Sequence, residues 1–172
     1  KNPHSMGPWT SDSKSHVAHM EAGDFYGSEQ SKVMEKATQV KIEFVDADGK
    51  TEILKEGLAL TEGEVIDAAV MNRNALRSFL AEQLNEAFEK NLLFSLHLKA
   101  TMMKVSDPII FGHCVEAYLG KVIEKHGKTL RSVGFNPNNG LSDFYQSLEK
   151  LDSNEKTEVL ASLDQVLGKR PD

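Results

Sequence analysis

The sequence contains a single cysteine, Cys114, and lacks any long hydrophobic run. One cysteine excludes a disulfide within the chain and is typical of proteins in a reducing compartment. The apolar runs stay well below the roughly 18 residues that a membrane-spanning helix requires. The first residues show no signal-peptide pattern. These absences predict a cytoplasmic protein without a membrane partner.

Positive charge is also scarce, because 20 lysines and arginines stand against 26 acidic residues, for a net charge of −6. This balance argues against nucleic acid as a main partner. Neither a G-x-G-x-x-G nor a P-loop phosphate motif is present. The 172 residues, of which 40% are hydrophobic and 27% charged, are typical of a globular domain with its own core.

The first half of the chain alternates apolar and polar residues more often than it repeats them at helical spacing. Residues 1–15 are rich in Pro, Gly and Ser and predict a lead-in or linker, while residues 16–172 predict a single subdomain. Asp48-Gly49 lies between two alternating runs, which indicates a β-hairpin. The elements expected here are strands at 17–20, 40–44, 51–55 and 64–71, a loop at 21–28 and a helical turn at 30–37.

Helical spacing dominates the second half. The segment Leu92–Leu98 is mostly apolar and, like 64–71, predicts a strand inside a sheet. Ser106-Asp107-Pro108 then supplies a cap and a first-turn proline for a helix. Helices are expected at about 74–90, 108–127, 141–151 and 154–167, with a turn at 136–140. We therefore expect an α/β domain, or alternatively α+β, in which helices flank a mixed β-sheet that includes the hairpin.

Lys99 is the residue that most needs an explanation. It directly follows the apolar segment Leu92–Leu98 and precedes a Met-rich turn and a helix start. Functional sites collect at the ends of central strands in α/β proteins, and burial favours the neutral, proton-accepting form of a lysine amine. The residues alone leave two readings open, a catalytic lysine and an ordinary surface lysine.

Other candidate groups favour structural readings. His16 and His19 are three residues apart, which on a strand places them on opposite faces and argues against a shared metal. His97 is expected on the same face as Lys99, as a core or supporting histidine. Near the start of the predicted helix, His113 and Cys114 lack a positioned base partner, so a buried structural cysteine is favoured.

Two further patterns also have simple structural explanations. Met71, Met102 and Met103 are expected to fill a core rather than bind a soft metal. The acidic run at 46–49 resembles half of a calcium loop but lacks the later Glu, so a hairpin turn is expected. The cluster at 136–140 could offer donors to an anion, although turn chemistry alone accounts for it.

Four blocks of sequence together resemble a known family. They read SDSKSHVAHM (11–20), GDFYGSEQ (23–30), HLKATMMKVSDPIIFGH (97–113) and GFNPNNGLSDFY (134–145). In this order they are similar to the monomeric type of bacterial NADP-dependent isocitrate dehydrogenase, and the resemblance covers essentially the whole chain. Because enzymes of this family are several times longer, we expect the chain to be an internal fragment and one subdomain of a larger enzyme.

The resemblance implies a function for the parent enzyme. It oxidises and decarboxylates isocitrate to 2-oxoglutarate and CO2, using NADP and bound Mg or Mn. The family's catalytic lysine matches Lys99, whereas Lys104 in the same motif is expected to be a structural or electrostatic neighbour. The metal aspartates, the partner tyrosine and the NADP-binding residues are expected beyond Asp172, so no metal or cofactor residue is assigned here.

The fragment alone is therefore expected to be inactive and to bind neither NADP nor metal. Its expected partners are isocitrate, in the parent enzyme, and the remaining domains of the same polypeptide. An apolar face left uncovered could also let the fragment self-associate. The alternative is a non-catalytic binding or interaction module that keeps the fold, and the flanking genomic sequence would discriminate between the two.

Overall fold

The computed structural model describes residue 5 and residues 7–172. Helices and strands are both present, which confirms the predicted mixture of α and β structure. The chain divides into two compact units. One joins the N-terminal residues up to Met20 with Arg73–Asp172, and the other is Glu21–Asn72. The expectation that residues 16–172 act as a single subdomain stays a prediction.

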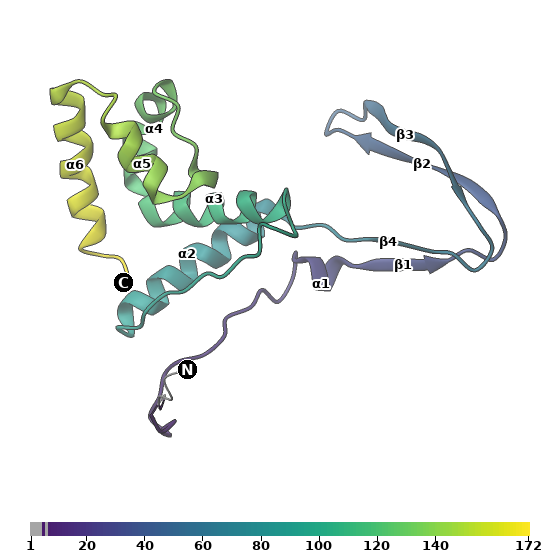
Figure 1. Ribbon diagram of the computed structural model, residues 1–172, viewed down its shortest axis with the longest axis horizontal. Coiled ribbons are helices and arrows are strands. Elements are labelled where there is room, and N and C mark those ends of the chain that lie inside the picture. Colours follow the sequence, from purple (N-terminus) through teal and green to yellow (C-terminus); the bar gives the residue numbers. More distant parts are fainter. Residues whose placement is uncertain (1–4, 6) are drawn as a thin grey trace. The chain divides into compact units, whose positions relative to one another are not determined.

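The unit Glu21–Asn72 consists of one short helix and four strands. Its strands form two separate two-stranded antiparallel sheets, β1 with β4 and β2 with β3 (Figure 1). The described residues therefore contain no larger mixed sheet, and the expected arrangement of strands was wrong in this respect. The elements are α1 (Phe25–Ser28), β1 (Gln30–Val33), β2 (Thr38–Val45), β3 (Thr51–Leu60) and β4 (Val65–Ala68).

The predicted hairpin is confirmed as β2 and β3, both longer than the alternation suggested. Its turn is fixed by Asp46, whose Oδ1 accepts hydrogen bonds from the backbone N–H groups of Asp48 and Lys50, at 3.0 and 2.8 Å. Asp, Asn and Ser side chains commonly stabilise turns in this way. The acidic run at 46–49 is thus a hairpin turn, as predicted.

Two expectations for this unit were wrong. The segment expected as a helical turn, 30–37, instead contains β1, because Gln30–Val33 pairs with Val65–Ala68. The strand expected at 64–71 is present as β4, but β1 is its only partner among the described strands, and Val65 is 59% exposed. Long-range pairing decided both outcomes, and sequence periodicity carries no information about pairing partners.

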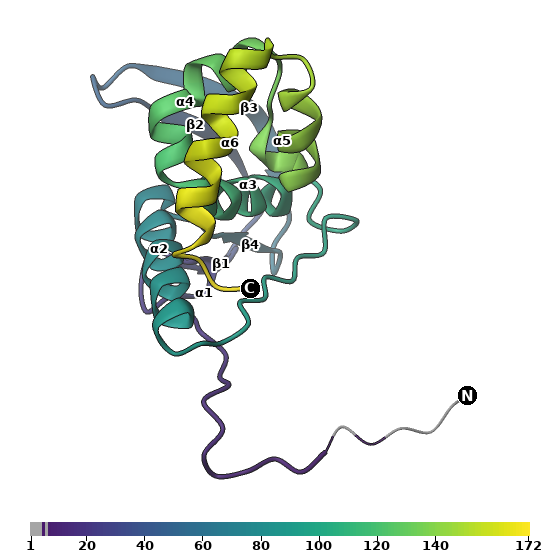
Figure 2. The ribbon, with the colours of Figure 1, turned by 90° about the vertical axis from the view of Figure 1, so that its left-hand side faces the viewer.

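The other unit is helical. Its main core lies between the helices that follow residue 106, and Phe144 at its centre meets Phe135 edge-to-face, with ring centroids 5.6 Å apart. Helix α6 runs beside α4 (Figure 2), and α2 packs against α3. The elements are α2 (Arg73–Glu89), α3 (Ser106–Leu119), α4 (Lys121–Ser132), the 3-10 turn η1 (Pro137–Asn139), α5 (Leu141–Leu148) and α6 (Ser153–Leu167). The predicted helices at 74–90, 141–151 and 154–167 and the turn at 136–140 are confirmed.

The single helix expected from Pro108 to about Gly127 is instead two helices, α3 and α4. The break falls at Gly120, whose φ of +41° is a conformation that L side chains rarely adopt. A Cβ at this position would also lie 2.7 Å from Arg170 Nη2. Glycine tolerates the backbone conformation of this turn and also leaves room for that guanidinium.

The strands expected at 17–20 and at 92–98 are absent. Both segments form neither helix nor strand and belong to neither sheet. In the second, the backbone N–H of Phe94 donates to the Asp172 carbonyl at 2.9 Å, in place of a neighbouring strand. An extended segment without a partner strand cannot form a ladder, however apolar its sequence.

In the predicted lead-in, residues 1–4 and 6 lie outside the described residues, and 7–15 form no helix or strand. No helix in the described part of the chain combines the length and apolar character needed to cross a membrane.

Candidate functional site around Lys99

Lys99 lies in an irregular segment between α2 and α3 rather than at the end of a strand. Its carbonyl accepts hydrogen bonds from the backbone N–H groups of Met102 and Met103, at 2.9 and 3.2 Å. The Met103 carbonyl in turn accepts from the Asp107 N–H at 3.2 Å. These bonds form consecutive turns that lead from Lys99 into the first turn of α3.

Asp107 anchors this segment. Its Oδ2 accepts the backbone N–H of Lys99 at 2.8 Å, and its Oδ1 accepts the Ser106 hydroxyl at 3.2 Å. The Asp107 side chain is 5% exposed, in the first turn of α3, where the helix dipole favours negative charge. A buried carboxylate with two donors therefore fixes the backbone at Lys99.

The cap predicted for this helix was wrong. The helix begins at Ser106, and its N-cap, Val105, makes no side-chain capping bond. The Asp107 carboxylate does not cap the helix. It accepts the backbone N–H of Lys99, eight residues earlier in the chain. Pro108 lies in the first turn, as predicted.

The Lys99 side chain itself is exposed, and its Nζ forms no ion pair with the described acidic residues. The apolar residues before Lys99 predict a buried strand that ends at this lysine, but no strand forms there. What the structure provides instead is an ordered backbone carrying an accessible amine. An amine so placed can accept or donate a proton once a substrate excludes water from it.

His97, expected to support Lys99, and two methionines expected in a core are exposed. His97 is exposed, and because no strand forms here, strand alternation does not place it on one face with Lys99. Met102 and Met103 are 68% and 46% exposed, so the expectation that they fill a core was wrong. Both belong to the turn segment that leads from Lys99 into α3.

Cys114 is a buried structural cysteine, as predicted, at 8% exposure. Burial raises the pKa of its thiol to about 11, which keeps it protonated and unreactive at neutral pH. Its neighbour His113 is half-buried, with Nδ1 3.5 Å from Glu116 Oε2. That nitrogen has no hydrogen-bond partner in the described structure.

His16 and His19 do not form a site. His16 Nδ1 lies 2.9 Å from the Lys14 carbonyl, and His19 Nδ1 lies 3.2 Å from the Met20 carbonyl. Each ring thus bonds to its own local backbone. In the part of the chain that the structure describes, no three His, Cys, Asp or Glu residues come together as metal ligands.

Two backbone N–H donors of the turn at 136–140 are bound to nearby side chains of the same region. The Asn136 N–H donates to Asp143 Oδ2 at 2.7 Å, and the Asn136 side chain accepts from the Asn138 N–H at 3.0 Å. At Gly112 in α3, a Cβ would lie 1.9 Å from Asn138 Oδ1, so this glycine lets η1 pack closely on α3. Packing and turn chemistry explain the cluster.

Sequence reasoning missed the anchoring role of Asp107. The signal was present in the Ser-Asp-Pro triplet, but it was interpreted as a local helix cap. A bond to Lys99, eight residues earlier, depends on how the intervening turns fold. No periodicity or capping rule describes such a contact.

Comparison with known proteins identifies the family. The family model described as "Monomeric isocitrate dehydrogenase" matches residues 1–172. The chain is 48% identical to isocitrate dehydrogenase (NADP) 2 of Colwellia maris and 45% identical to isocitrate dehydrogenase (NADP) of Azotobacter vinelandii, in each case over 99% of this chain. It is 44% identical to isocitrate dehydrogenase (NADP) 2 of Mycobacterium tuberculosis over 100% of this chain. The chain spans 23% of the length of each of these relatives. The family model and these identities show that the chain belongs to the monomeric isocitrate dehydrogenase family.

Proposed function

We propose that the polypeptide containing this chain is an NADP-dependent isocitrate dehydrogenase that converts isocitrate to 2-oxoglutarate and CO2. The observation that carries this proposal is the identity of 44–48% to proteins of that name over 99–100% of the chain. In this proposal the chain works in the cytoplasm, with isocitrate and the remaining domains of its own polypeptide as partners.

Within that reaction we assign Lys99 the role of a proton-handling group. Two observations support the assignment, the match of the HLKATMMK block to the family motif and the anchoring of the Lys99 backbone by buried Asp107. A fixed backbone limits the positions that a long side chain can reach, which is what catalysis requires of a general acid or base. The exposed amine is free to meet a substrate bound by the rest of the enzyme.

The described residues do not fit the divalent metal that the family implies. No three potential ligands converge anywhere in them, and Mg and Mn need several oxygen ligands. We therefore assign no metal ligand to this chain and derive no step through a metal. NADP belongs to the proposal for the whole polypeptide, and the proposal gives this chain no cofactor residue.

The test uses the longer polypeptide that contains this chain and follows NADP reduction with isocitrate and Mg or Mn. Lys99→Met should lower kcat by about a hundredfold or more, the range for losing a general acid or base. Lys104→Met is the matched control, since it removes the same charge from an exposed lysine in the same turn segment. Its effect should stay within a few-fold.

Two results would contradict the proposal in different ways. Full turnover by Lys99→Met would reject the catalytic assignment and leave the activity in place. Absence of isocitrate-dependent NADP reduction by the unmodified polypeptide would reject the activity and favour an interaction module.

A further inference from the structure

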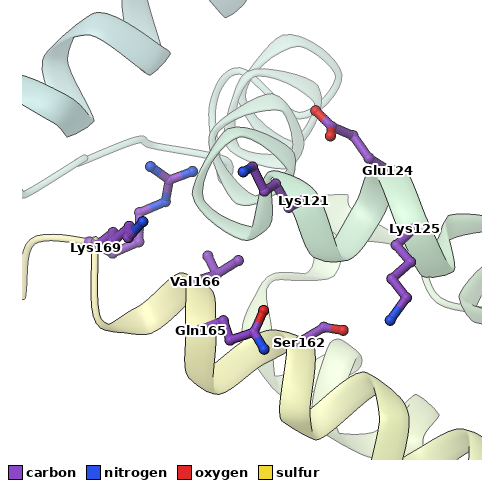
Figure 3. A pocket seen from close by; sticks show the side chains of 8 residues that line it. Lys121, Glu124, Lys125, Ser162, Gln165, Val166 and Lys169 are labelled. Carbon is purple, nitrogen blue, oxygen red and sulfur yellow. The ribbon is translucent and has the colours of Figure 1, made fainter.

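A groove lies between α4 and α6, on elements that carry none of the residues of the Lys99 site. Its volume is about 560 Å³, within the range of small-molecule sites. Figure 3 shows the side chains of α4 and of the end of α6 that surround it. The lining residues are Lys121, Glu124, Lys125, Ser162, Gln165, Val166, Lys169 and Arg170.

The lining is strongly cationic, although the chain as a whole is acidic. Three lysines and one arginine face a single carboxylate, Glu124, in a protein of net charge −6. In Figure 3, Glu124 points away from α6 whereas Lys125 points toward it. None of the groove lysines forms an ion pair with a described acidic residue, in contrast to Lys90 and Lys156. Their charges are therefore available to a ligand.

Arg170 is held in place within this groove. Its Nε donates to the Tyr118 carbonyl at 2.7 Å and its Nη2 to the Ala117 carbonyl at 3.0 Å. These carbonyls belong to the last turn of α3, where a cation is favoured. The missing side chain of Gly120 makes room for the guanidinium. The groove therefore contains one pre-positioned cation as well as three flexible ones.

The opposite wall adds a fixed hydroxyl. Ser162 Oγ donates to the Glu158 carbonyl at 3.0 Å and lies 2.9 Å from Nε2 of buried His126. A hydroxyl oxygen has one donor and two acceptor positions, and these contacts hold Ser162 in one orientation. Gln165 supplies an amide, and buried Val166 an apolar floor.

From this arrangement we infer that the groove binds a small, phosphate-bearing polyanion. Lysine ammonium groups and a fixed guanidinium are the usual protein partners of phosphate oxygens. The concave shape and the volume suit a small molecule better than a protein segment, which would need a longer surface. This site is independent of the proposed function, because it shares no residue with Lys99 or its anchor.

The probe is inorganic tripolyphosphate, titrated calorimetrically into the 172-residue chain at low and at high salt. Lys125→Glu should weaken binding by about tenfold or more, which corresponds to about 1.4 kcal/mol. Lys128→Glu is the matched control, because Lys128 is an exposed lysine on the same helix that does not line the groove. It should change affinity by less than about twofold, since added salt screens distant charges. Unchanged far-UV circular dichroism checks that both variants fold.

Each remaining outcome overturns part of the inference. Absence of binding to the unmodified chain, or equal weakening by both variants, would reject a specific site. Tighter binding of citrate than of tripolyphosphate would reject phosphate as the recognised group. Binding by this chain but not by the longer polypeptide would show that another segment of the enzyme occupies the groove.

Discussion

The two units of this chain solve the problem of burying apolar side chains very differently. In the helical unit, residues from α3 to α6 form a continuous core in which Phe144, Leu119 and Val159 are fully buried. In Glu21–Asn72, the buried hydrophobic residues are Met34 and Leu60, while Phe44 and Leu54 are 53% and 60% exposed. The helices thus provide their own core, and the two-stranded sheets do not.

This difference indicates which part of the chain depends on its surroundings. Isolated two-stranded sheets are marginally stable in water, because they lack a second layer to cover their apolar residues. The chain spans 23% of the length of its relatives. We therefore expect the sheets of Glu21–Asn72 to gain most from contacts outside the chain, and self-association of the chain alone through such uncovered residues stays a prediction.

The largest effect should come from the helical core. Phe144→Ala removes a ring that is fully buried and meets both Phe135 and Tyr145 edge-to-face. The expected loss is about 3–5 kcal/mol of unfolding free energy, from lost burial and the cavity left behind. Urea unfolding of the chain, followed by far-UV circular dichroism at the helix signal, measures it.

The control is the same substitution in the other unit. Phe44→Ala on β2 removes a ring that is already half-exposed, so it should cost less than about 1 kcal/mol. Hydrogen exchange at the β2 and β3 amides measures this loss, because the helix signal reports mainly on the other unit. Equal losses from the two substitutions would mean that the ring of Phe44 is covered in solution. The contrast between the units would then be wrong.

A smaller loss of unfolding free energy is expected from a substitution in the Lys99 segment, which lies outside the main helical core. Asp107→Ala removes the acceptor of the Lys99 N–H, and we expect a loss of about 1 kcal/mol, near the lower end for such bonds, because water can reach Lys99. Hydrogen exchange at the Lys99 amide should become faster, whereas exchange in α5 should not change.

Asp107→Asn provides the rescue control. Its amide oxygen can still accept the Lys99 N–H, so exchange there should remain closer to that of the unmodified chain. If Ala and Asn leave the Lys99 amide equally protected, Asp107 does not anchor the segment.

Local sequence patterns were sufficient for most helices and for the hairpin, but not for segments 17–20 and 92–98 or for the break at Gly120. The apolar spacing at 74–90 and 154–167 predicted α2 and α6 within a few residues, because an amphipathic helix is specified by residues close in sequence. The hairpin was predictable for the same reason, since Asp48-Gly49 joins strands that are neighbours in sequence.

The errors concern long-range partners. Leu92–Leu98 has the composition of a buried strand, yet no described strand pairs with it, and Phe94 bonds to Asp172 at the far end of the chain. Gly120, where the predicted helix breaks, likewise leaves room for the side chain of Arg170, fifty residues later, and no local pattern describes that contact. The same reason applies to the candidate site: Lys99 is a prediction from its motif, whereas its bond to Asp107 is a contact that the motif does not describe.

The smallest expected effect is a change of stability with pH that comes from one histidine. Histidine titration reports on one unit, because none of the six histidines lies in Glu21–Asn72. The pKa of His126 in α4 is lowered, first by burial and then by the charge of Lys125, against an opposing contribution from Glu158. The folded state therefore binds this proton less readily than the unfolded state. The resulting stabilisation is complete above the ordinary histidine pKa of about 6.5 and is lost as pH falls through that value toward the lowered pKa.

We expect the unmodified chain to lose stability relative to His126→Gln as pH falls from about 7.5 to about 5. Comparing the two proteins at each pH cancels the titration of carboxylates, which both share, and glutamine keeps a polar group facing Ser162. The measurement is the urea midpoint from the helix signal, combined with hydrogen exchange at the β2 and β3 amides. A difference that is constant with pH would reject the lowered pKa. A change in exchange at β2 and β3 equal to that in α4 would show instead that the two units unfold together, and the helical core would then also support the strands.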